Sequence, residues 1–455
     1  MLNTLLLILL QALGMVVFFN RYIAGIALKL LRRRVFDEAD YSQQPTVTVI
    51  VPMFNEGENI RSTLESLLAL DYPHDKLEIT VVDDCSTDDS YQHALAIARK
   101  SGGRMRVVRN RVNLGKRRSI NAAVLASRAE IIVSVDSDVV VSAGAVRHMV
   151  ARFTRPEIAA VGGWIDVRNK HDNWLTRMQT VKYFFGYHSL KNLEWAFQRI
   201  MCLSGCLTAY RRSVLIELHP ILEQRAICGV PIKYGEDRFL TRQIIKAGYR
   251  TTMTLDATCW TSAPTTLMGY FSQQLRWRRS NIVDYAGGMS HVWQLNPLIA
   301  VHYFSLFGLL LAYPALLMNA IIHGTIFSMI IRQLAIATVL GLVYWWKARK
   351  LGIERVHPLA FLPMALILPV IYALMTPLAL FTLDSGSWET RSHDEIEPGS
   401  GERVDGAVAE ALVVSVSSSA PAVPVAAASM AVAPVAAGGT SGVASATAHA
   451  ELPAA

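Results

Sequence analysis

The chain is poor in charged residues and in cysteine for its length of 455 residues. Only 18% of its residues are Asp, Glu, Lys or Arg, whereas soluble proteins carry about 25%, so the composition indicates a membrane component. Its five cysteines are too few for a small disulfide scaffold and have no C-x-x-C spacing, so we expect reduced thiols and no zinc site. Long aliphatic runs exclude a chain that is disordered or fibrous throughout.

Two nucleotide-binding signatures are also missing. There is no Walker loop, and no G-x-G-x-x-G follows the first predicted strand, so ATPases and dinucleotide-dependent enzymes lose their usual support. The formal net charge is +8, which suits nucleic acid, anionic lipid or a phosphorylated substrate. The basic residues lie around a membrane boundary and a candidate diphosphate site, so we expect no nucleic-acid partner.

The hydrophobic residues are grouped in blocks at either side of a more polar region. Residues 1–34 form an apolar stretch that ends in three arginines, which predicts an uncleaved transmembrane anchor with these arginines in the cytoplasm. Residues 285–331 contain no charged side chain, and with the apolar residues that follow they can form two helices of about 20 residues. We place these helices near 297–318 and 325–346.

A third apolar run, residues 356–383, contains four prolines. Because each proline removes a helix hydrogen bond, we expect a broken, re-entrant segment that returns Trp388 to the cytoplasmic side. Residues 297–383 would then form a C-terminal membrane region. Residues 401–455 are mostly Ala, Val, Ser, Pro and Gly without a sustained period, which predicts a disordered tail.

The polar block, residues 45–290, has alternating strand and helix patterns. The predicted strands and helices alternate along its first half, with one further helix near its end: strands at 46–51, 77–82, 105–109 and 131–135, and helices at 57–70, 90–100, 116–126 and 239–247. This order predicts an α/β domain with a mostly parallel sheet flanked by helices on both faces, inserted between transmembrane helices. Ligands of such sheets bind outside the carboxyl ends of the strands.

Polar clusters follow three of the predicted strands: Asn55-Glu56, Asp83-Asp84 and Asp136-Ser137-Asp138. Two carboxylates two residues apart at a strand end can hold a hard divalent cation that also binds phosphate oxygens, although Asp and Ser are also ordinary turn residues. Lys116-Arg117-Arg118 begins a predicted helix. Cations at a helix start suit a diphosphate ligand; the alternative is that these side chains only form a solvated face. Together these clusters predict a nucleotide-diphosphate site.

Two further motifs lie later in the block. In Tyr234-Gly235-Glu236-Asp237-Arg238 a carboxylate can act as the general base for a sugar hydroxyl, or one acid can simply cap the following helix. In Gln273-x-x-Arg276-Trp277 the tryptophan suits stacking on a sugar ring and the arginine suits a phosphate. The alternative for the second motif is an interfacial helix with a snorkelling arginine and an aromatic anchor.

These motifs, taken in order, resemble those of processive family-2 glycosyltransferases, in particular hyaluronan synthases and rhizobial chitooligosaccharide synthases. Ser204–Arg212 is similar to their acceptor-side loop, and Trp388-Glu389-Thr390-Arg391 to their W-x-T-R segment. The likeness covers about residues 40–392. It rests on six ordered blocks: Val51–Glu56, Val82–Asp84, Gly115–Arg117, Asp136–Asp138, Gly235–Arg238 and Gln273–Trp277.

The resemblance implies a GT-A-type domain that binds a UDP-sugar. Asp83, with Asp84 beside it, would read the uracil and ribose, and Lys116 would contact the diphosphate. Asp136 would support the nucleotide and, with Asp138, form the site of an Mg or Mn ion.

The resemblance also implies roles on the acceptor side. Asp237 would deprotonate the acceptor hydroxyl for an inverting displacement, and the Q-x-x-R-W residues Gln273, Arg276 and Trp277 would line the acceptor terminus and hold the leaving UDP. Two positions depart from the pattern. Cys206 replaces a proline or small residue, and Glu236 replaces the aspartate common in hyaluronan synthases, which favours the chitooligosaccharide type.

The expected function is a processive inverting transferase that polymerises an N-acetylglucosamine-containing β-glycan, hyaluronan- or chitin-like, and extrudes it. Its partners would be UDP-N-acetylglucosamine, alone or with UDP-glucuronate, the growing glycan and the lipid bilayer. The protein would be a multi-pass component of the plasma (bacterial inner) membrane with a cytoplasmic catalytic domain. The alternatives are a non-processive transferase to a lipid carrier and a non-catalytic subunit of a polysaccharide export complex. The Q-x-x-R-W motif opposes the first alternative, and the intact acidic motifs oppose the second.

Overall fold

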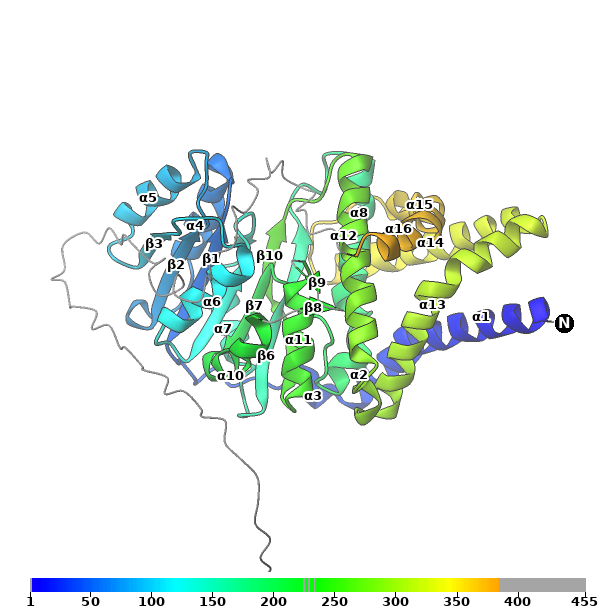
Figure 1. Cartoon of the computed structure of the whole chain (residues 1–455), viewed down its shortest axis with the longest axis horizontal. Coiled ribbons are helices and arrows are strands. Elements are labelled where there is room, and N and C mark those ends of the chain that lie inside the picture. Colours follow the sequence, from blue (N-terminus) through cyan, green and yellow to red (C-terminus); the bar gives the residue numbers. More distant parts are fainter. Residues whose placement is uncertain (1, 224–225, 228–229, 233, 384–455) are drawn as a thin grey trace, which may run out of the picture. The chain divides into compact units, whose positions relative to one another are not determined.

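The computed structural model describes residues 2–223, 226–227, 230–232 and 234–383. Figure 1 shows a sheet covered by helices, joined to a group of long helices. The predicted tail, residues 401–455, and the Trp388–Arg391 segment lie outside the described residues.

Eight strands form one mixed sheet of order β3-β2-β1-β4-β7-β6-β10-β5. Strand β1 pairs in parallel with β2 and β4, β2 pairs in parallel with β3, and β6 pairs in parallel with β10, while β7 runs antiparallel between β4 and β6. The predicted mostly parallel sheet is confirmed. The strands are β1 Val47–Met53, β2 Leu77–Asp83, β3 Met105–Arg109, β4 Ile131–Val135, β5 Val140–Val141, β6 Ile158–Val167, β7 Leu207–Arg211 and β10 Arg250–Thr261, with β8 Ala226–Ile227 and β9 Val230–Pro231 in a separate pair.

Helices cover both faces of the sheet, because side chains of a strand alternate between its faces. In β1, Val49 and Val51 pack into one apolar cluster with Leu64 of α4, while Ile50 packs into the other with Leu218 of α10. The prediction of helices on both faces is therefore confirmed. The helices of this region are α4 Ile60–Leu68, α5 Ser90–Lys100, α6 Lys116–Ala126, α7 Ala145–Val150, α8 Trp174–His188, α9 Asn192–Ala196, α10 Arg212–Glu223, α11 Glu236–Lys246 and α12 Leu267–Gly288, with short turns η2 Gly57–Asn59, η3 His74–Lys76 and η4 Val292–Gln294.

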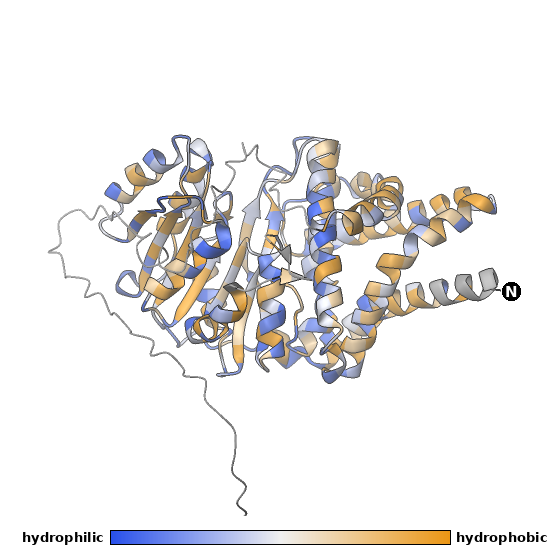
Figure 2. Cartoon of the chain, viewed as in Figure 1, coloured by the Kyte–Doolittle hydropathy of each residue, from blue (hydrophilic) through white to orange (hydrophobic). Residues whose placement is uncertain are grey.

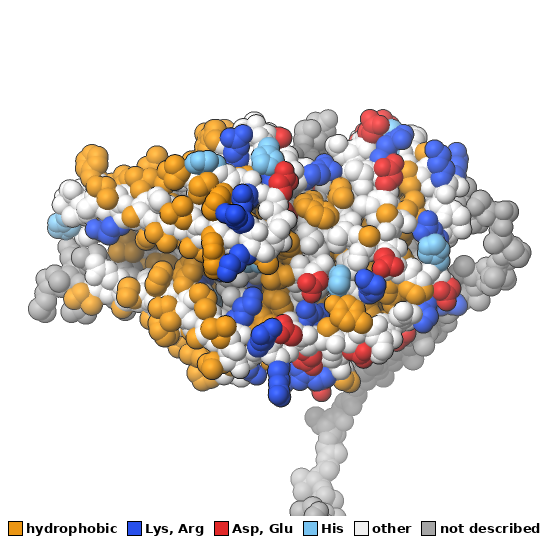
Figure 3. All heavy atoms as spheres, turned by 180° about the vertical axis from the view of Figure 1, so that it is seen from behind, with side chains coloured by type: hydrophobic (Ala, Val, Ile, Leu, Met, Phe, Trp, Pro, Cys, Tyr) orange, Lys and Arg blue, Asp and Glu red, His pale blue; other side chains and the backbone are white. Residues whose placement is uncertain are grey.

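Among the described residues, four helical stretches are long and apolar enough to cross a membrane, judged by length and composition: Gln11–Leu31, Pro297–Ile322, Ile326–Lys350 and Pro358–Phe381. Figure 2 shows their hydrophobic colouring beside the more polar sheet region, and in Figure 3 hydrophobic side chains gather over the same helices. The N-terminal stretch consists of α1 Leu2–Phe18, η1 Phe19–Ala24 and α2 Gly25–Leu31, followed by α3 Arg33–Asp37. The two predicted helices are confirmed as α13 Pro297–Ile322 and α14 Ile326–Lys350, each slightly longer than expected.

The proline-containing run is an irregular helical stretch in which the type of helix changes three times. Its parts are η5 Pro358–Phe361, α15 Met364–Val370, the π-helical η6 Ile371–Met375 and α16 Thr376–Phe381. Residues 364–381 are helical throughout, with one π-helical turn in the middle, and the expected re-entrant path stays a prediction. The first part of the run packs tightly on α14, where the Pro358 carbonyl leaves no room for a side chain at Gly341.

The far end of this run contacts the sheet domain. Arg279 Nε of α12 donates to Thr382 Oγ1 at 3.0 Å, and Tyr234 Oη donates to the Leu383 carbonyl at 2.7 Å. Tyr234 lies two residues before helix α11. The last described residue of the run is therefore held against the domain that carries the acidic motifs.

The hydrogen bonds at Thr382 and Leu383 give a test of the predicted membrane topology. A cysteine placed at Ser385, two residues beyond Leu383, should lie on the same side of the membrane as the sheet domain, which the positive-inside rule places in the cytoplasm. An impermeant thiol reagent should label it only after the cells are permeabilised.

The matched control is His323→Cys in the turn between α13 and α14, which should be labelled in intact cells. The unaltered protein provides the background from natural thiols. Ready labelling of the Ser385 variant in intact cells would contradict the re-entrant arrangement.

Candidate active site

One cavity of about 990 Å³ lies at the carboxyl ends of the central strands and is bounded by helices α8 and α12. Parallel pairing in register, with Met53 of β1 opposite Asp83 of β2, brings the ends of these strands to one edge. Eight of the nine predicted site residues line the cavity, and Asp83 does not. The eight are Asp84, Lys116, Asp136, Asp138, Asp237, Gln273, Arg276 and Trp277.

Lys116 forms the centre of the charged part of the cavity. Its Nζ atom lies 2.6 Å from Asp136 Oδ1 and 3.2 Å from Glu236 Oε1, and its side chain is only 16% exposed. Although burial disfavours the charge, the Asp136 and Glu236 carboxylates raise the pKa of Lys116 above its ordinary value. The ammonium therefore stays charged and joins the end of β4 to the start of α11.

Asp84 holds the loop that presents Lys116. Its Oδ1 accepts hydrogen bonds from Leu114 N and Asn110 Nδ2, both at 2.8 Å, and its Oδ2 accepts one from Gly115 N at 2.7 Å. Both oxygens are thus engaged by the chain itself. This environment suits a residue that positions the start of α6.

Asp83 has different surroundings, although the sequence pairs it with Asp84. Its side chain is fully buried behind the cavity, where Oδ2 lies 3.0 Å from Arg109 Nε and Oδ1 accepts from Ser86 N at 3.2 Å. Burial raises the pKa of Asp83. Its predicted contact with uracil and ribose stays a prediction.

The Asp136-Ser137-Asp138 turn follows β4 directly. Both aspartates line the cavity, and Ser137 Oγ donates to the buried Glu56 that follows β1. Within the described ranges, no group of three or more His, Cys, Asp or Glu residues is placed to hold a metal ion.

The second acidic motif lies in the first turn of α11. This helix begins at Glu236, whereas the sequence predicted a start at residue 239. The reason is Gly235, whose φ of +67° admits the left-handed turn and whose carbonyl accepts the bond from Phe239 N at 3.2 Å. A side chain at Gly235 would also collide with Ser280 of α12.

The two carboxylates of this turn have opposite pKa shifts. Burial and the Glu236 carboxylate raise the pKa of Asp237. Burial acts in the same direction on Glu236, but the charge and hydrogen bond of Lys116, a backbone hydrogen bond and the charge of Arg276 together lower the pKa of Glu236. Asp237 is thus the carboxylate better suited to accept a proton, because a general base works best with a pKa near the working pH.

A loop containing Gly205 and Cys206 closes one side of the charged region. A side chain at Gly205 would meet Lys116 Nζ at 3.2 Å and Asp136 Oδ1 at 3.6 Å.

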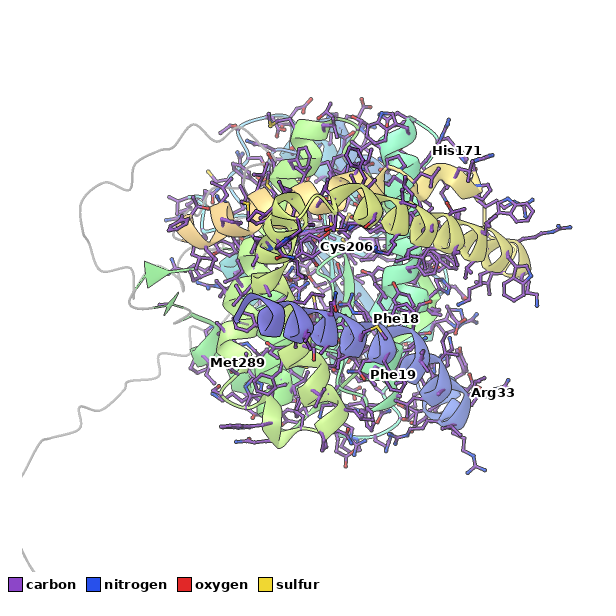
Figure 4. The ribbon with its side chains drawn as sticks, turned by 90° about the vertical axis from the view of Figure 1, so that its right-hand side faces the viewer. Phe18, Phe19, Arg33, His171, Cys206 and Met289 are labelled. Atoms are coloured by element: carbon purple, nitrogen blue, oxygen red, sulfur yellow. The ribbon has the colours of Figure 1, made fainter. Side chains whose placement is uncertain are left out.

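Figure 4, viewed from the side of the membrane helices, places Cys206 near the middle of the picture. Burial raises the pKa of Cys206 and raises that of Cys202 to about 11, so both remain thiols. Cys85 and Cys259 are also free, and Cys228 lies outside the described residues.

Helix α8 forms a wall of the cavity that the sequence did not reveal. Its cavity-lining residues are Lys182, Tyr183, Gly186 and Tyr187, and its start is capped by Asn173, which accepts from the backbone of Leu175 and Thr176. No polar motif marks this helix. The one available signal was a lysine surrounded by aromatic residues in an otherwise apolar helical stretch.

Helix α12 faces this wall with Trp277. The rings of Tyr183 and Trp277 are 6.3 Å apart, and Lys182 Nζ lies 5.4 Å from the centre of the Trp277 ring. Lys182 Nζ donates to Gln274 Oε1 at 2.8 Å. Burial, and to a lesser extent Arg278, lower the pKa of Lys182 to about 7.

The fold and the cavity define a class of protein. A GT-A-like mixed sheet, acidic residues at its strand ends and a buried lysine opposite an aromatic wall are the features of a glycosyltransferase. Comparison with known proteins agrees: residues 48–219 match the model of glycosyl transferase family 2. The chain belongs to this family, so the resemblance drawn from the motifs is confirmed.

Two relatives cover most of the chain. An N-acetylglucosaminyltransferase of Bradyrhizobium diazoefficiens is 32% identical over 76% of this chain and 72% of its own length. An N-acetylglucosaminyltransferase of Rhizobium meliloti is 32% identical over 78% of this chain and 84% of its own. Among solved structures, a mannosyltransferase of Pyrobaculum calidifontis in complex with GDP-Man and Mn²⁺ has a TM-score of 0.51, with 20% identity, over 84% of this chain and 100% of its own. This last likeness concerns the fold.

Proposed function

We propose that the protein is a membrane-embedded, inverting and processive transferase that builds a chitin-like β-glycan from UDP-N-acetylglucosamine and extrudes it. One observation carries the proposal: a single cavity holds both the charged residues suited to a nucleotide diphosphate and the aromatic wall suited to a saccharide. The N-acetylglucosaminyltransferase relatives support the choice of sugar. The four apolar helices support a position in the plasma membrane of a bacterium, with the sheet domain in the cytoplasm.

The donor side would be held by the charged residues around Lys116. Its ammonium would pair with the diphosphate, while Asp84 keeps the preceding loop in place. Asp136 and Asp138 fit an Mg²⁺ or Mn²⁺ ion, because such ions usually take one or two carboxylates and complete their shell with phosphate oxygens and water. When bound, this ion would neutralise charge that develops on the departing UDP.

The transfer itself would be a single displacement. The Asp237 carboxylate takes the proton of the acceptor hydroxyl, and the hydroxyl oxygen forms a bond to the anomeric carbon from the face opposite the diphosphate. The bond between that carbon and the β-phosphate oxygen breaks, and its electron pair leaves with UDP. Inversion follows because the attacking and leaving oxygens lie on opposite faces.

The acceptor would be held by the α12 side of the cavity. Trp277 would stack on the terminal sugar, and Gln273 and Arg276 would bond its hydroxyl groups and the leaving diphosphate. Processive elongation would follow if the lengthened chain moved toward the membrane helices while its new terminus stayed at Trp277. The irregular helical run of residues 358–381 is linked to helix α12 by the hydrogen bond from Arg279 to Thr382.

The product test separates the competing functions. Membranes that contain the protein are supplied with labelled UDP-N-acetylglucosamine, with and without UDP-glucuronate, and the product is digested with chitinase or hyaluronidase. We expect a polymer without glucuronate that chitinase degrades and hyaluronidase does not. A glucuronate requirement would indicate hyaluronan, a solvent-extractable short product would indicate a lipid carrier, and no transfer would indicate an export subunit.

The Asp138→Asn variant should lose turnover that depends on Mg²⁺ or Mn²⁺ while remaining folded in the membrane. The reason is the loss of one of the two carboxylates at the Asp136-Ser137-Asp138 turn that would hold the ion. Titration of each metal against the transfer rate measures the effect. Asp75→Asn, an exposed aspartate of the same domain, is the control and should behave as wild type. An unchanged metal dependence in Asp138→Asn would remove Asp138 from the site.

The Asp237→Asn variant should lower the transfer rate by about 10²–10⁴-fold, the usual contribution of a general base, with UDP binding unchanged. The base works only when deprotonated, and its pKa is raised. The wild-type rate should therefore fall as the pH drops through that pKa. This fall should occur at a higher pH than the pKa of an ordinary aspartate would give.

The Glu236→Gln variant tests the assignment of the base. Removing the Glu236 charge lowers the pKa of Asp237, so the acid limb of the rate profile should move to lower pH. An inactive Glu236→Gln together with an active Asp237→Asn would show that Glu236 is the base.

A further inference from the structure

Helix α8 presents a continuous stripe to the cavity. Lys182, Tyr183, Gly186 and Tyr187 are spaced i, i+1, i+4 and i+5, so they share one helical face. Trp277 of α12 faces this stripe, with its ring 6.3 Å from that of Tyr183. Two tyrosines and a tryptophan around one space form a surface suited to the apolar faces of pyranose rings.

Gly186 leaves an unfilled space within this stripe. A Cβ atom built at Gly186 would have no neighbouring atom within 4 Å, although the residue lies in the middle of α8 and lines the cavity. Glycine is unfavourable inside a helix relative to alanine. Packing of the described chain does not explain the missing side chain, whereas a ligand substituent at this position would.

Lys182 lies one helical turn before that space. Its Nζ atom donates to Gln274 Oε1 at 2.8 Å and lies 3.3 Å from Tyr270 Oη. It forms no ion pair with any described residue, and an amine has at least one further position available for hydrogen bonding. Its lowered pKa, about 7, agrees with a site that receives a neutral group.

We propose that helix α8 determines the acceptor specificity, with Gly186 receiving the methyl group of an acetamido substituent and Lys182 donating a hydrogen bond to its carbonyl oxygen. An acetamido group combines a small apolar end with a hydrogen-bond acceptor, which matches a vacant space beside an N–H donor. The ligand is therefore the N-acetylated sugar at the end of the growing glycan. This inference rests on the proposed function and deepens it.

Gly186→Ala is the most informative variant, because it separates function from stability. Alanine adds a methyl group to the space and improves helix formation, so the unfolding temperature should stay equal or rise. The KM for a trisaccharide of N-acetylglucosamine, added as acceptor to the purified full chain in detergent, should rise at least fivefold. The KM for UDP-N-acetylglucosamine should change less than twofold.

The substituent is tested by comparing two acceptors. Wild-type protein should prefer the N-acetylglucosamine trisaccharide to cellotriose, which lacks the acetamido group, and Gly186→Ala should reduce this preference. Gly14→Ala is the matched control, since Gly14 is also in a helix with no atom within 4 Å of an added Cβ, away from the cavity. It should change neither KM.

Lys182→Met keeps most of the side chain but removes the amine. It should weaken the binding of the N-acetylated trisaccharide, measured by titration calorimetry, about tenfold, and cellotriose binding much less. Gln274→Leu removes the same hydrogen bond between α8 and α12 but keeps the Lys182 amine. It therefore shows how much of the loss in trisaccharide binding comes from the missing link between the helices. If it lowers trisaccharide binding as much as Lys182→Met does, Lys182 acts only as a link between the helices and the proposal fails.

The outcomes separate this inference from the proposed function. Wild-type transfer together with an unchanged acceptor KM in Gly186→Ala overturns the role of α8 and leaves the proposed function intact. A wild-type protein that neither transfers from UDP-N-acetylglucosamine nor binds the trisaccharide overturns both.

Discussion

The charged group of Lys116 connects three elements that are far apart in the sequence. It lies at the start of α6, it contacts Asp136 after β4, and it contacts Glu236 at the start of α11. A charge that is mostly removed from water needs partners, and loss of one partner leaves the others uncompensated. The positions of the two acidic motifs relative to each other therefore depend on this lysine. Asp84 contributes indirectly, because its carboxylate fixes the loop from which Lys116 extends.

Helix α12 connects this charged region to the membrane helices. Ser280 packs against Gly235, just before the catalytic candidates, and Trp277 faces the aromatic wall of α8. On the same helix Arg279 bonds to Thr382 at the end of the irregular membrane run. A displacement of α12 would thus alter the α11 turn and the end of the membrane region together.

Local patterns predicted much of the domain. The strands and helices between residues 46 and 135 agree with the prediction within about two residues, because β-branched runs, proline and glycine act over short distances. Eight of the nine predicted site residues line the cavity: parallel strands bring four of them to one edge of the sheet, and helices α11 and α12 supply the other four. The strands β6, β7 and β10 and helix α8 were not predicted, since they carry no clear local signal and their places are set by packing with distant segments.

The sequence by itself determined the α/β class, the long apolar helices, the irregularity of the proline-containing run and the acidic motifs, since each depends on composition or on neighbouring residues. Only the tertiary structure decided which acids share an environment. Asp83 and Asp84 are adjacent in the chain, yet their side chains point in different directions at the end of β2. Asp83 is buried away from the cavity, whereas Asp84 lines its wall. The opposite pKa shifts of Glu236 and Asp237, and the space beside Gly186, likewise arise from contacts between distant segments. Such contacts depend on packing in three dimensions, which no local pattern encodes.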